Sequence, residues 1–152
     1  MDICIKELND YKKAPIKLLL LADPSENAVK DYLNRGKCYV AYYNEKMVGV
    51  YVLIDTRPLT MELVNIAVDE DYQNNGIGKI MINDALDRCR EKNIKVVEVG
   101  TGNSSISQLQ LYQRCGFRIT GIDKDFFKIH YKEEIFENKI QCIDMIRLSI
   151  NL

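Results

Sequence analysis

The stretch DYQNNGIGKI, Asp71–Ile80, stands between an apolar run and a helical pattern. The run before it, LVNIAV (residues 63–68), has the composition of a buried strand, and MINDALDRC (residues 81–89) has the spacing of a helix. Gly76 and Gly78 therefore fall where a strand passes into a helix. Such a position is either a tight turn or a site where bare backbone N–H groups meet a ligand.

The composition favours one ordinary globular domain that occupies residues 1–152. Apolar residues make up 47% of the chain and charged residues 28%, and the formal net charge is -1. A chain of this length buries roughly 70% of its unfolded surface, so it needs no disulfide to hold a core. The near-neutral charge argues against a general attraction to nucleic acid, and the apolar run at residues 16–22 is too short to cross a bilayer. We therefore expect a cytoplasmic protein with no nucleic-acid or membrane partner.

The cysteines follow neither a disulfide pattern nor a metal-site pattern. There are five of them, an odd number, no CxxC pair occurs, and His130 is the only histidine. These features favour reduced thiols and argue against a zinc site, so we expect no metal. Cys115 has no base beside it in the sequence, and we expect no nucleophilic role for it.

Strand and helix patterns follow one another in the order β-α-α-β-β-β-α-β-α-β-β. Ser25 or Asp23 is the start signal of the second helix and Gly36 is its stop signal, and Asn44-Glu45-Lys46 is a hairpin signal. Segment 128–139 is expected to be a polar connection. The order predicts an α+β or mixed α/β fold with one central sheet. The expected strands are residues 2–8, 37–43, 47–56, 60–68, 95–101, 117–127 and 142–150, and the expected helices are 15–23, 23–36, 76–92 and 104–115.

The two glycines suit an anion because they open a helix. The first N–H groups of a helix lack intrahelical partners and carry partial positive charge, and glycine removes the Cβ atoms that would keep a phosphate away. Gln73, Asn74 and Asn75 could add side-chain donors, and Lys79 is either a phosphate contact or a solvated helix residue. The stretch lacks the Gly-Lys-Ser/Thr ending of a Walker loop and the third glycine of a Rossmann fingerprint. Taken alone, it fits a plain turn and an anion site equally well.

Two further stretches complete a more specific combination: TMELVNIAV before the turn and LYQRCGF (Leu111–Phe117) after it. With Gln73-Asn74-Asn75-Gly76-Ile77-Gly78, which fits the pattern Arg/Gln-x-x-Gly-x-Gly/Ala, they resemble the GNAT family of N-acetyltransferases from about Val40 to Leu148. The resemblance implies a central twisted, mostly antiparallel sheet flanked by about four helices, with a splayed parallel strand pair at the cofactor site. It also implies an N-acetyltransferase that moves an acetyl group from acetyl-CoA, its co-substrate, to a primary amine of a small molecule or peptide by direct attack.

In such an enzyme the helix start holds the coenzyme pyrophosphate, and the free edge of the preceding strand pairs with the pantetheine arm. The family often has an asparagine seven residues before the tyrosine of the later motif. Here Ser105 holds that position and Asn103 lies nine before, and Asn103 also suits a helix cap. The expected cofactor-binding residues are Ile66, Ala67, Val68, Gln73, Asn74, Asn75, Gly76, Ile77, Gly78 and Lys79, with Asn103 or Ser105.

The resemblance gives two candidate catalytic residues, and each has a structural alternative. Tyr112, with an ordinary pKa of about 10, is protonated at neutral pH and would donate to the leaving thiolate; otherwise it is a core aromatic. Glu62 interrupts an apolar strand and shares parity with Val64, Ile66 and Val68, which predicts that all four point to one face. It would act as a base through a water or attract the cationic amine; otherwise it is a solvated or salt-bridged strand residue.

The acceptor is suggested only by composition. Acidic and aromatic residues expected near its side favour a cationic small amine, with a protein N-terminus or a lysine also open. A non-catalytic acyl-CoA-binding sensor module is the alternative function, and Tyr112 favours the enzyme because a sensor needs no acid. Monomer and homodimer are both open. The expected lining residues are Tyr32, Glu62, Phe126, Phe127 and Tyr131.

Overall fold

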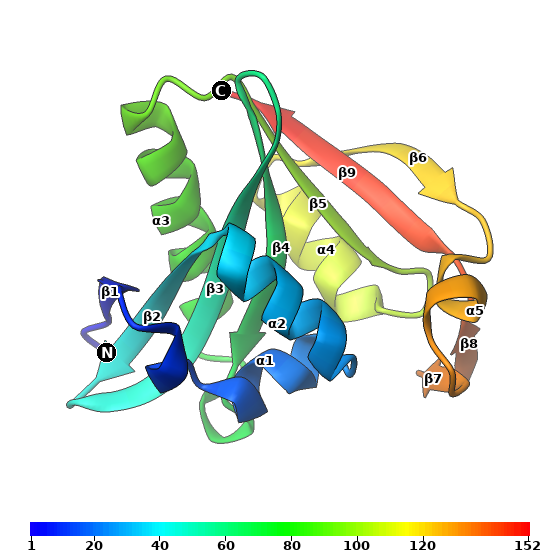
Figure 1. Ribbon diagram of the computed structural model, residues 1–152, viewed down its shortest axis with the longest axis horizontal. Helices are drawn as coiled ribbons and strands as arrows, with labels where there is room; N and C mark the ends of the chain where they lie inside the picture. Colours follow the sequence, from blue (N-terminus) through cyan, green and yellow to red (C-terminus); the bar gives the residue numbers. More distant parts are fainter.

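The computed structural model describes residues 1–152 and contains one seven-stranded sheet with helices on both faces, together with a separate two-stranded hairpin (Figure 1). The strands are β1 (Cys4–Leu8), β2 (Lys37–Tyr43), β3 (Lys46–Arg57), β4 (Thr60–Val68), β5 (Val96–Gly102), β6 (Arg118–Asp123), β7 (Ile135–Glu137), β8 (Ile140–Cys142) and β9 (Met145–Asn151). The helices are α1 (Ile16–Ala22), α2 (Glu26–Arg35), α3 (Ile77–Glu91), α4 (Ile106–Arg114) and α5 (Phe126–His130), with 3-10 turns at Tyr11–Lys13 and Glu70–Tyr72.

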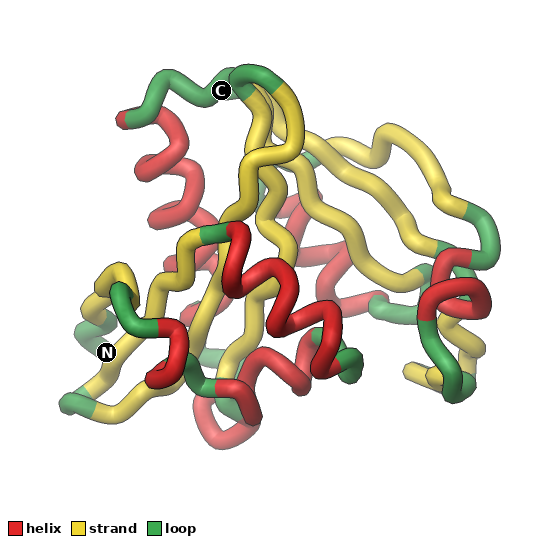
Figure 2. The backbone as a smooth tube through the Cα atoms, in the orientation of Figure 1, coloured by secondary structure: helices red, strands yellow, loops and turns green.

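The large sheet has the order β1-β2-β3-β4-β5-β9-β6. Every neighbouring pair is antiparallel except β4 and β5, which run parallel. Helices α1 and α2 lie on one face and α3 and α4 on the other, as Figures 1 and 2 show. Separate buried cores fill the two faces: Leu19 and Val29 belong to the first, Met81 and Tyr112 to the second. The predicted mixed α/β fold is confirmed.

The capping and turn residues that the sequence indicates lie at the ends of the elements observed. The Ser25 hydroxyl accepts the N–H of Ala28 at 3.2 Å at the start of α2, and Gly36 caps the end of that helix. Asn44 and Glu45, between β2 and β3, have φ values of +48° and +68°. Positive φ at both central residues is the geometry of a tight two-residue hairpin turn, as the sequence indicates.

One segment differs from the prediction. Residues 128–139, expected to be a polar connection, contribute to α5 and to the β7–β8 hairpin; we call residues 126–142 the arm. The hairpin turns at Asn138 and Lys139, both with positive φ. The predicted strand at residues 117–127 extends past the end of β6 at Asp123. The predicted strand at residues 142–150 begins before the start of β9 at Met145. Three-residue strands are too short to show a period, which is why the pattern missed them.

A bulge interrupts the pairing of β4 with β3. Val52 pairs with Asn65, but the next residue, Leu53, pairs with Leu63. Val64 is therefore an extra residue without a partner across the ladder. An extra residue reverses the alternation of side chains beyond it, because the period of a strand is two.

The bulge decides which way Glu62 points. Glu62 pairs with Ile54, which lies in the core beneath α1 and α2, and Val64 packs against that same core. Ile66 and Val68 instead pack against the core beneath α3 and α4. The prediction that Glu62 shares a face with Ile66 and Val68 is therefore wrong, and Glu62 faces the α1–α2 side.

Candidate active site

A cleft of about 520 Å³ opens between the end of β4, the start of α3, the end of α1 and one side of α4. It gathers most of the residues predicted to bind the coenzyme, although they come from a strand, a turn and a helix. Those that line it are Ile66, Ala67, Val68, Gln73, Asn74, Gly76, Ile77, Gly78 and Lys79, and Tyr112 lines it as well. Asn75, Asn103, Ser105 and Glu62 are not part of its lining.

The separation of β4 from β5 creates one wall of the cleft. The two strands pair only as far as Leu63 and Val99. Beyond that point β5 stays with β9 as far as Gly102, whereas β4 stays with β3. The edge of β4 at residues 66–68 therefore faces no strand. Its free backbone groups suit an extended ligand that would pair as an additional strand.

The start of α3 presents unpaired N–H groups to the same cleft. Gly76 is the N-cap, with a left-handed φ of +80°, and nothing stands within 4 Å of the position that its Cβ would occupy. The first intrahelical bond runs from Ile80 N to Gly76 O at 3.1 Å, so the N–H groups of Ile77, Gly78 and Lys79 have no acceptor in the protein. These N–H groups and the helix dipole together suit a phosphate.

The polar residues before the glycines shape the turn. Gln73 Nε2 donates to the Val68 carbonyl at 3.0 Å, and Asn75 Nδ2 donates to the carbonyls of Tyr72 and Gln73, both at 3.1 Å. Asn74 has a left-handed φ of +64°. The amides of Gln73 and Asn75, expected to serve as ligand donors, thus already have backbone partners. What these residues supply is the path of the backbone into α3.

Tyr112 stands on the inner wall of the cleft. Its side chain is 4% exposed, and its ring packs edge-on against Phe117 with centroids 5.9 Å apart. Burial, and then the nearby Cys115, raise the pKa of Tyr112 above its ordinary value. Its hydroxyl has no hydrogen-bond partner in the protein and is not among the buried unpaired atoms, so it opens to the cleft. The two sequence alternatives are compatible: the ring is core and the hydroxyl is a free donor.

Asn103 and Ser105 hold the arm. Asn103 Nδ2 donates to the Gln141 carbonyl at 3.1 Å, and its Oδ1 accepts the two backbone N–H groups just before β9 at 2.8 and 3.0 Å. The Ser105 hydroxyl donates to Glu137 at 2.8 Å. Neither side chain caps α4 or lines the coenzyme cleft. The coenzyme contact expected from Asn103 or Ser105 therefore stays a prediction, and the hydrogen bonds that the two side chains make here are to the arm and to the backbone before β9.

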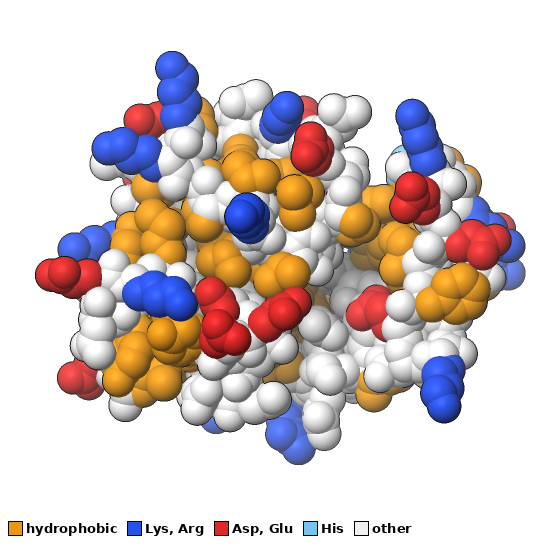
Figure 3. Space-filling model, turned by 90° about the horizontal axis from the view of Figure 1, so that it is seen from below, with side chains coloured by type: hydrophobic (Ala, Val, Ile, Leu, Met, Phe, Trp, Pro, Cys, Tyr) orange, Lys and Arg blue, Asp and Glu red, His pale blue; other side chains and the backbone are white.

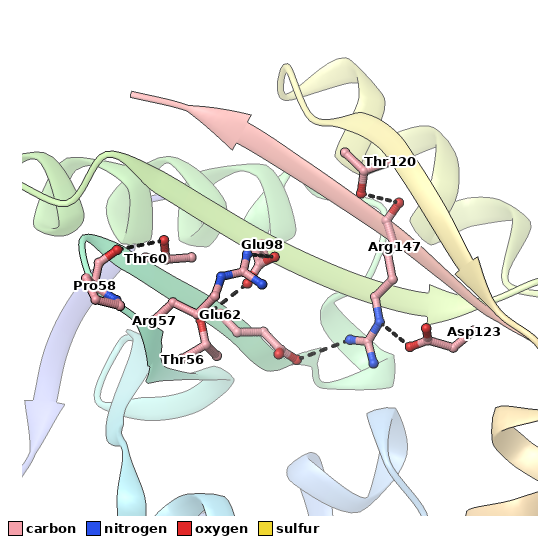
Figure 4. Close-up of polar contacts among 9 residues, drawn as sticks. All are labelled: Thr56, Arg57, Pro58, Thr60, Glu62, Glu98, Thr120, Asp123 and Arg147. Atoms are coloured by element: carbon pink, nitrogen blue, oxygen red, sulfur yellow. Dashed lines mark hydrogen bonds and ion pairs between the residues drawn. The ribbon is translucent and has the colours of Figure 1, made fainter.

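Glu62 lies on the opposite face of β4 from Tyr112. Its side chain is 20% exposed, it accepts no hydrogen bond, and its nearest cation is Arg147, with Nη1 3.8 Å from Oε2 (Figure 4). Burial raises the pKa of Glu62, while the positive charge of Arg147 opposes that rise. A half-buried carboxylate without hydrogen bonds is available to receive a proton.

The face that carries Glu62 borders a hollow between the helices α1 and α2 and the arm, and Figure 3 shows this side of the molecule. Asp23 joins the two walls, because its carboxylate accepts the hydroxyl of Tyr131 from the arm at 2.7 Å and that of Tyr32 from α2 at 3.2 Å. Asn65 Nδ2 donates to the Tyr32 oxygen at 2.7 Å and to the Leu19 carbonyl at 2.9 Å. Tyr32 and Tyr131, both expected near the acceptor, therefore fix the arm against the helices.

Several site residues were missed by sequence reasoning. Arg147 carried a usable signal, because it is a charge within an apolar strand, as Glu62 is. The polar residues of α4 carried none, since such residues are ordinary on an exposed helix face. The missed residues of the cleft are Leu21, Ala22, Tyr72, Ser107, Gln108, Gln110 and Leu111.

All five cysteines are free, and burial raises the pKa of Cys115, which keeps that thiol protonated. No group of three His, Cys, Asp or Glu side chains could hold a metal ion. No helix of the protein combines the length and the apolar character needed to cross a membrane.

Comparison with known proteins gives one consistent result. Residues 7–117 match the sequence model of the acetyltransferase (GNAT) family. The uncharacterized N-acetyltransferase YvbK of Bacillus subtilis is 56% identical over 135 residues, which are 89% of this chain and 87% of that protein.

Two solved structures are similar over nearly the whole chain. A GNAT family acetyltransferase from Elizabethkingia anophelis with acetyl-CoA bound is 47% identical, with a TM-score of 0.96 over 99% of this chain and 98% of that one. A Bacillus subtilis acetyltransferase in complex with CoA is 51% identical, with a TM-score of 0.95 over 99% of both chains. The free edge of β4 and the open helix start fit the same co-substrate here. The chain belongs to the GNAT family and is an acetyl-CoA-dependent N-acetyltransferase.

Proposed function

We propose that this enzyme moves the acetyl group to a primary amine of a small molecule or peptide by direct attack of the amine nitrogen on the thioester carbonyl carbon. The observation that supports it is the separation of β4 from β5, which opens a gap in the sheet that can be reached from both of its faces. Tyr112 belongs to the α3–α4 side of the sheet, and Glu62 faces the α1–α2 side, one residue before the last paired position, Leu63 with Val99. A thioester lying along the edge of β4 would therefore have a proton donor on one side and a proton acceptor on the other.

The two side chains would divide the proton transfers. As the N–C bond forms and the C–S bond breaks, the amine loses a proton and the sulfur gains one. Glu62, directly or through a water, takes the amine's proton, and burial brings the pKa of its carboxyl nearer to neutrality. Tyr112 donates to the leaving sulfur, and a free N–H of β4 donates to the carbonyl oxygen.

The coenzyme's phosphates would lie at the start of α3. The N–H groups of Ile77, Gly78 and Lys79 point there without partners, and Gly76 leaves the approach open. The exposed side chains of Lys79 and Arg114 add positive charge at the rim of the same cleft. Their contribution is electrostatic and would weaken with salt.

The acceptor would enter from the hollow beside the arm. Asp23, Glu62 and Asp123 give that side negative charge, and Phe126 and Phe127 give it aromatic surface. This lining suits a cationic small amine that sheds its proton next to Glu62.

The test is a panel of amines assayed with acetyl-CoA by the release of free thiol. The panel holds polyamines, aminoglycosides, amino acids, lysine derivatives and short peptides with free N-termini. We expect at least one cationic small amine to raise thiol release above the rate with water alone, and mass spectrometry to find that amine acetylated. Thiol release that never exceeds the water rate, together with tight acetyl-CoA binding, would contradict the proposal.

A further inference from the structure

Two carboxylates lie opposite each other on the parallel strands β4 and β5, and only one of them has close hydrogen-bond partners. Glu62 on β4 pairs in register with Glu98 on β5. Glu98 is fully engaged, since Arg57 Nη2 lies 2.7 Å away and the Thr56 hydroxyl donates to it at 3.2 Å. Glu62 has no such partner, and Arg147 stops 3.8 Å away. Figure 4 shows the tight pair and the loose one side by side.

Arg147 stops short because another carboxylate holds it. Its Nε donates to Asp123 on β6 at 2.7 Å, and its guanidinium carbon lies 5.6 Å from the ring centre of Phe126. The side chain crosses Gly100, where a Cβ would come within 3.1 Å of Nη1. The guanidinium is thus fixed by a short bond on the side away from Glu62.

We propose that Asp123 and Arg147 are positioning residues for Glu62: Asp123 holds the guanidinium short of the Glu62 carboxylate, which leaves that carboxylate open to the amine of the acceptor. The inference rests on the proposed role of Glu62 as the group that receives the acceptor's proton. A carboxylate gripped by Arg147 would be a weak base, because a close cation stabilises its charged form. One without any cation would remain protonated to a higher pH.

The charges around Glu62 come from four elements. Arg147 on β9 and Arg35 on α2 lower the pKa of Glu62, while Glu98 on β5 and Asp123 on β6 raise it. Arg35 and Glu98 have close partners of their own, Asp31 and Arg57. Arg147 is therefore the cation whose position relative to Glu62 one substitution can change.

The direct test is a carbon-13 NMR titration of the Glu62 carboxyl in the full chain, assigned by its absence in Glu62→Gln. Asp123→Asn releases Arg147, which can then move closer to Glu62. The titration midpoint of Glu62 should therefore fall by on the order of half to one pH unit. Arg147→Gln should raise the midpoint. In the double variant, Asp123→Asn should add only the small direct effect of its own charge on Glu62, well below the shift that it causes when Arg147 is present.

A matched control removes a charge close by without touching this network. Asp125 is exposed and has a left-handed φ of +61°, which Asn also tolerates. Asp125→Asn should leave the midpoint where it is. Far-UV circular dichroism and melting temperature confirm that each variant is folded. Unchanged midpoints in Asp123→Asn and Arg147→Gln, or a full Asp123→Asn shift without Arg147, would overturn the inference.

Kinetics then separate this inference from the proposed function. With a weakly basic acceptor amine, the acidic limb of kcat/KM should move down in pH for Asp123→Asn and up for Arg147→Gln, in step with the NMR midpoints. If Glu62→Gln keeps full activity, the role of Glu62 fails and the inference fails with it. If Glu62→Gln is impaired while the acidic limb does not move in the other two variants, only the inference fails.

Discussion

A Cβ placed on Gly78 would come within 3.2 Å of Leu111 Cδ2, whereas a Cβ placed on Gly76 would meet nothing within 4 Å. The two glycines therefore have different functions. Gly78 lets α3 pack closely on α4, the helix that carries Tyr112. Gly76 supplies the left-handed backbone that starts α3 and leaves open space in front of the free N–H groups.

The first prediction concerns that open space. Gly76→Asp should weaken acetyl-CoA binding by on the order of 100-fold or more, because a carboxylate would face the diphosphate. Gly76→Asn is the matched control, since Asn has the same size, no charge and tolerance for a left-handed φ. Calorimetric titration with acetyl-CoA measures both variants. Equal affinities in the two would mean that the helix start does not hold phosphate.

The second prediction separates structure from cofactor binding at Asn103. Asn103→Ala removes three hydrogen bonds, one to the arm at Gln141 and two to the backbone just before β9, and should cost about 1–3 kcal/mol of stability. The Kd for acetyl-CoA should change by less than about twofold, because the side chain lies outside the cleft. Chemical denaturation and calorimetry measure the two quantities. A tenfold loss of affinity at unchanged stability would restore the cofactor role that the family resemblance implies.

The parts of this fold that could be predicted from sequence are those with local causes. Ser25 and Gly36 bound α2 because capping depends on neighbouring residues, and Asn44 starts a hairpin turn because asparagine accepts positive φ. The coenzyme-binding side of the cleft could be predicted for the same reason. Residues 66–79 are one continuous stretch, and its turn and helix start bring the backbone of the whole stretch to one place.

The acceptor side could not be predicted because it depends on contacts between distant segments. Strict alternation along β4 predicts that Glu62 shares a face with Ile66 and Val68. The prediction is wrong because no local sequence signal indicates the extra residue at Val64. Arg147 and Asp123 reach Glu62 only through the order β4-β5-β9-β6. The arm escaped detection because its hairpin strands are three residues long.

The third prediction uses the sign of the Glu62 shift. A carboxyl whose folded pKa is raised binds its proton more tightly in the folded state, so ionisation of Glu62 costs stability as pH rises through that pKa. Glu62→Gln removes this cost and should raise the melting temperature at pH 7–8 by on the order of 1–3 °C. The gain should shrink to nothing below the unfolded pKa, where the carboxyl is protonated in both states. Melting curves from pH 4 to 8 measure it, and a lower melting temperature at neutral pH would show that the pair with Arg147 outweighs burial.

The fourth prediction concerns the hydroxyl of Tyr112. Tyr112→Phe keeps the ring against Phe117 and removes an oxygen that has no partner in the protein, so the melting temperature should stay within about 2 °C. The kcat should fall roughly 10–1,000-fold, with the KM for acetyl-CoA little changed, because the lost hydrogen bond forms only as the sulfur leaves. Steady-state thiol release with the best amine of the panel measures both constants.

A packing control decides what such a fall means. Phe117→Leu disturbs the same aromatic contact without removing a hydroxyl, and it should lower stability by about 1 kcal/mol while kcat stays near that of the wild type. A comparable loss of kcat in both variants would make Tyr112 a packing residue.

The pH profile gives a second criterion. Because burial raises the pKa of Tyr112, its proton stays in place throughout the assay range, so Tyr112→Phe should lower the whole profile without moving its acidic limb. Glu62→Gln should change that limb, and the two proton-transfer groups can be told apart by this difference.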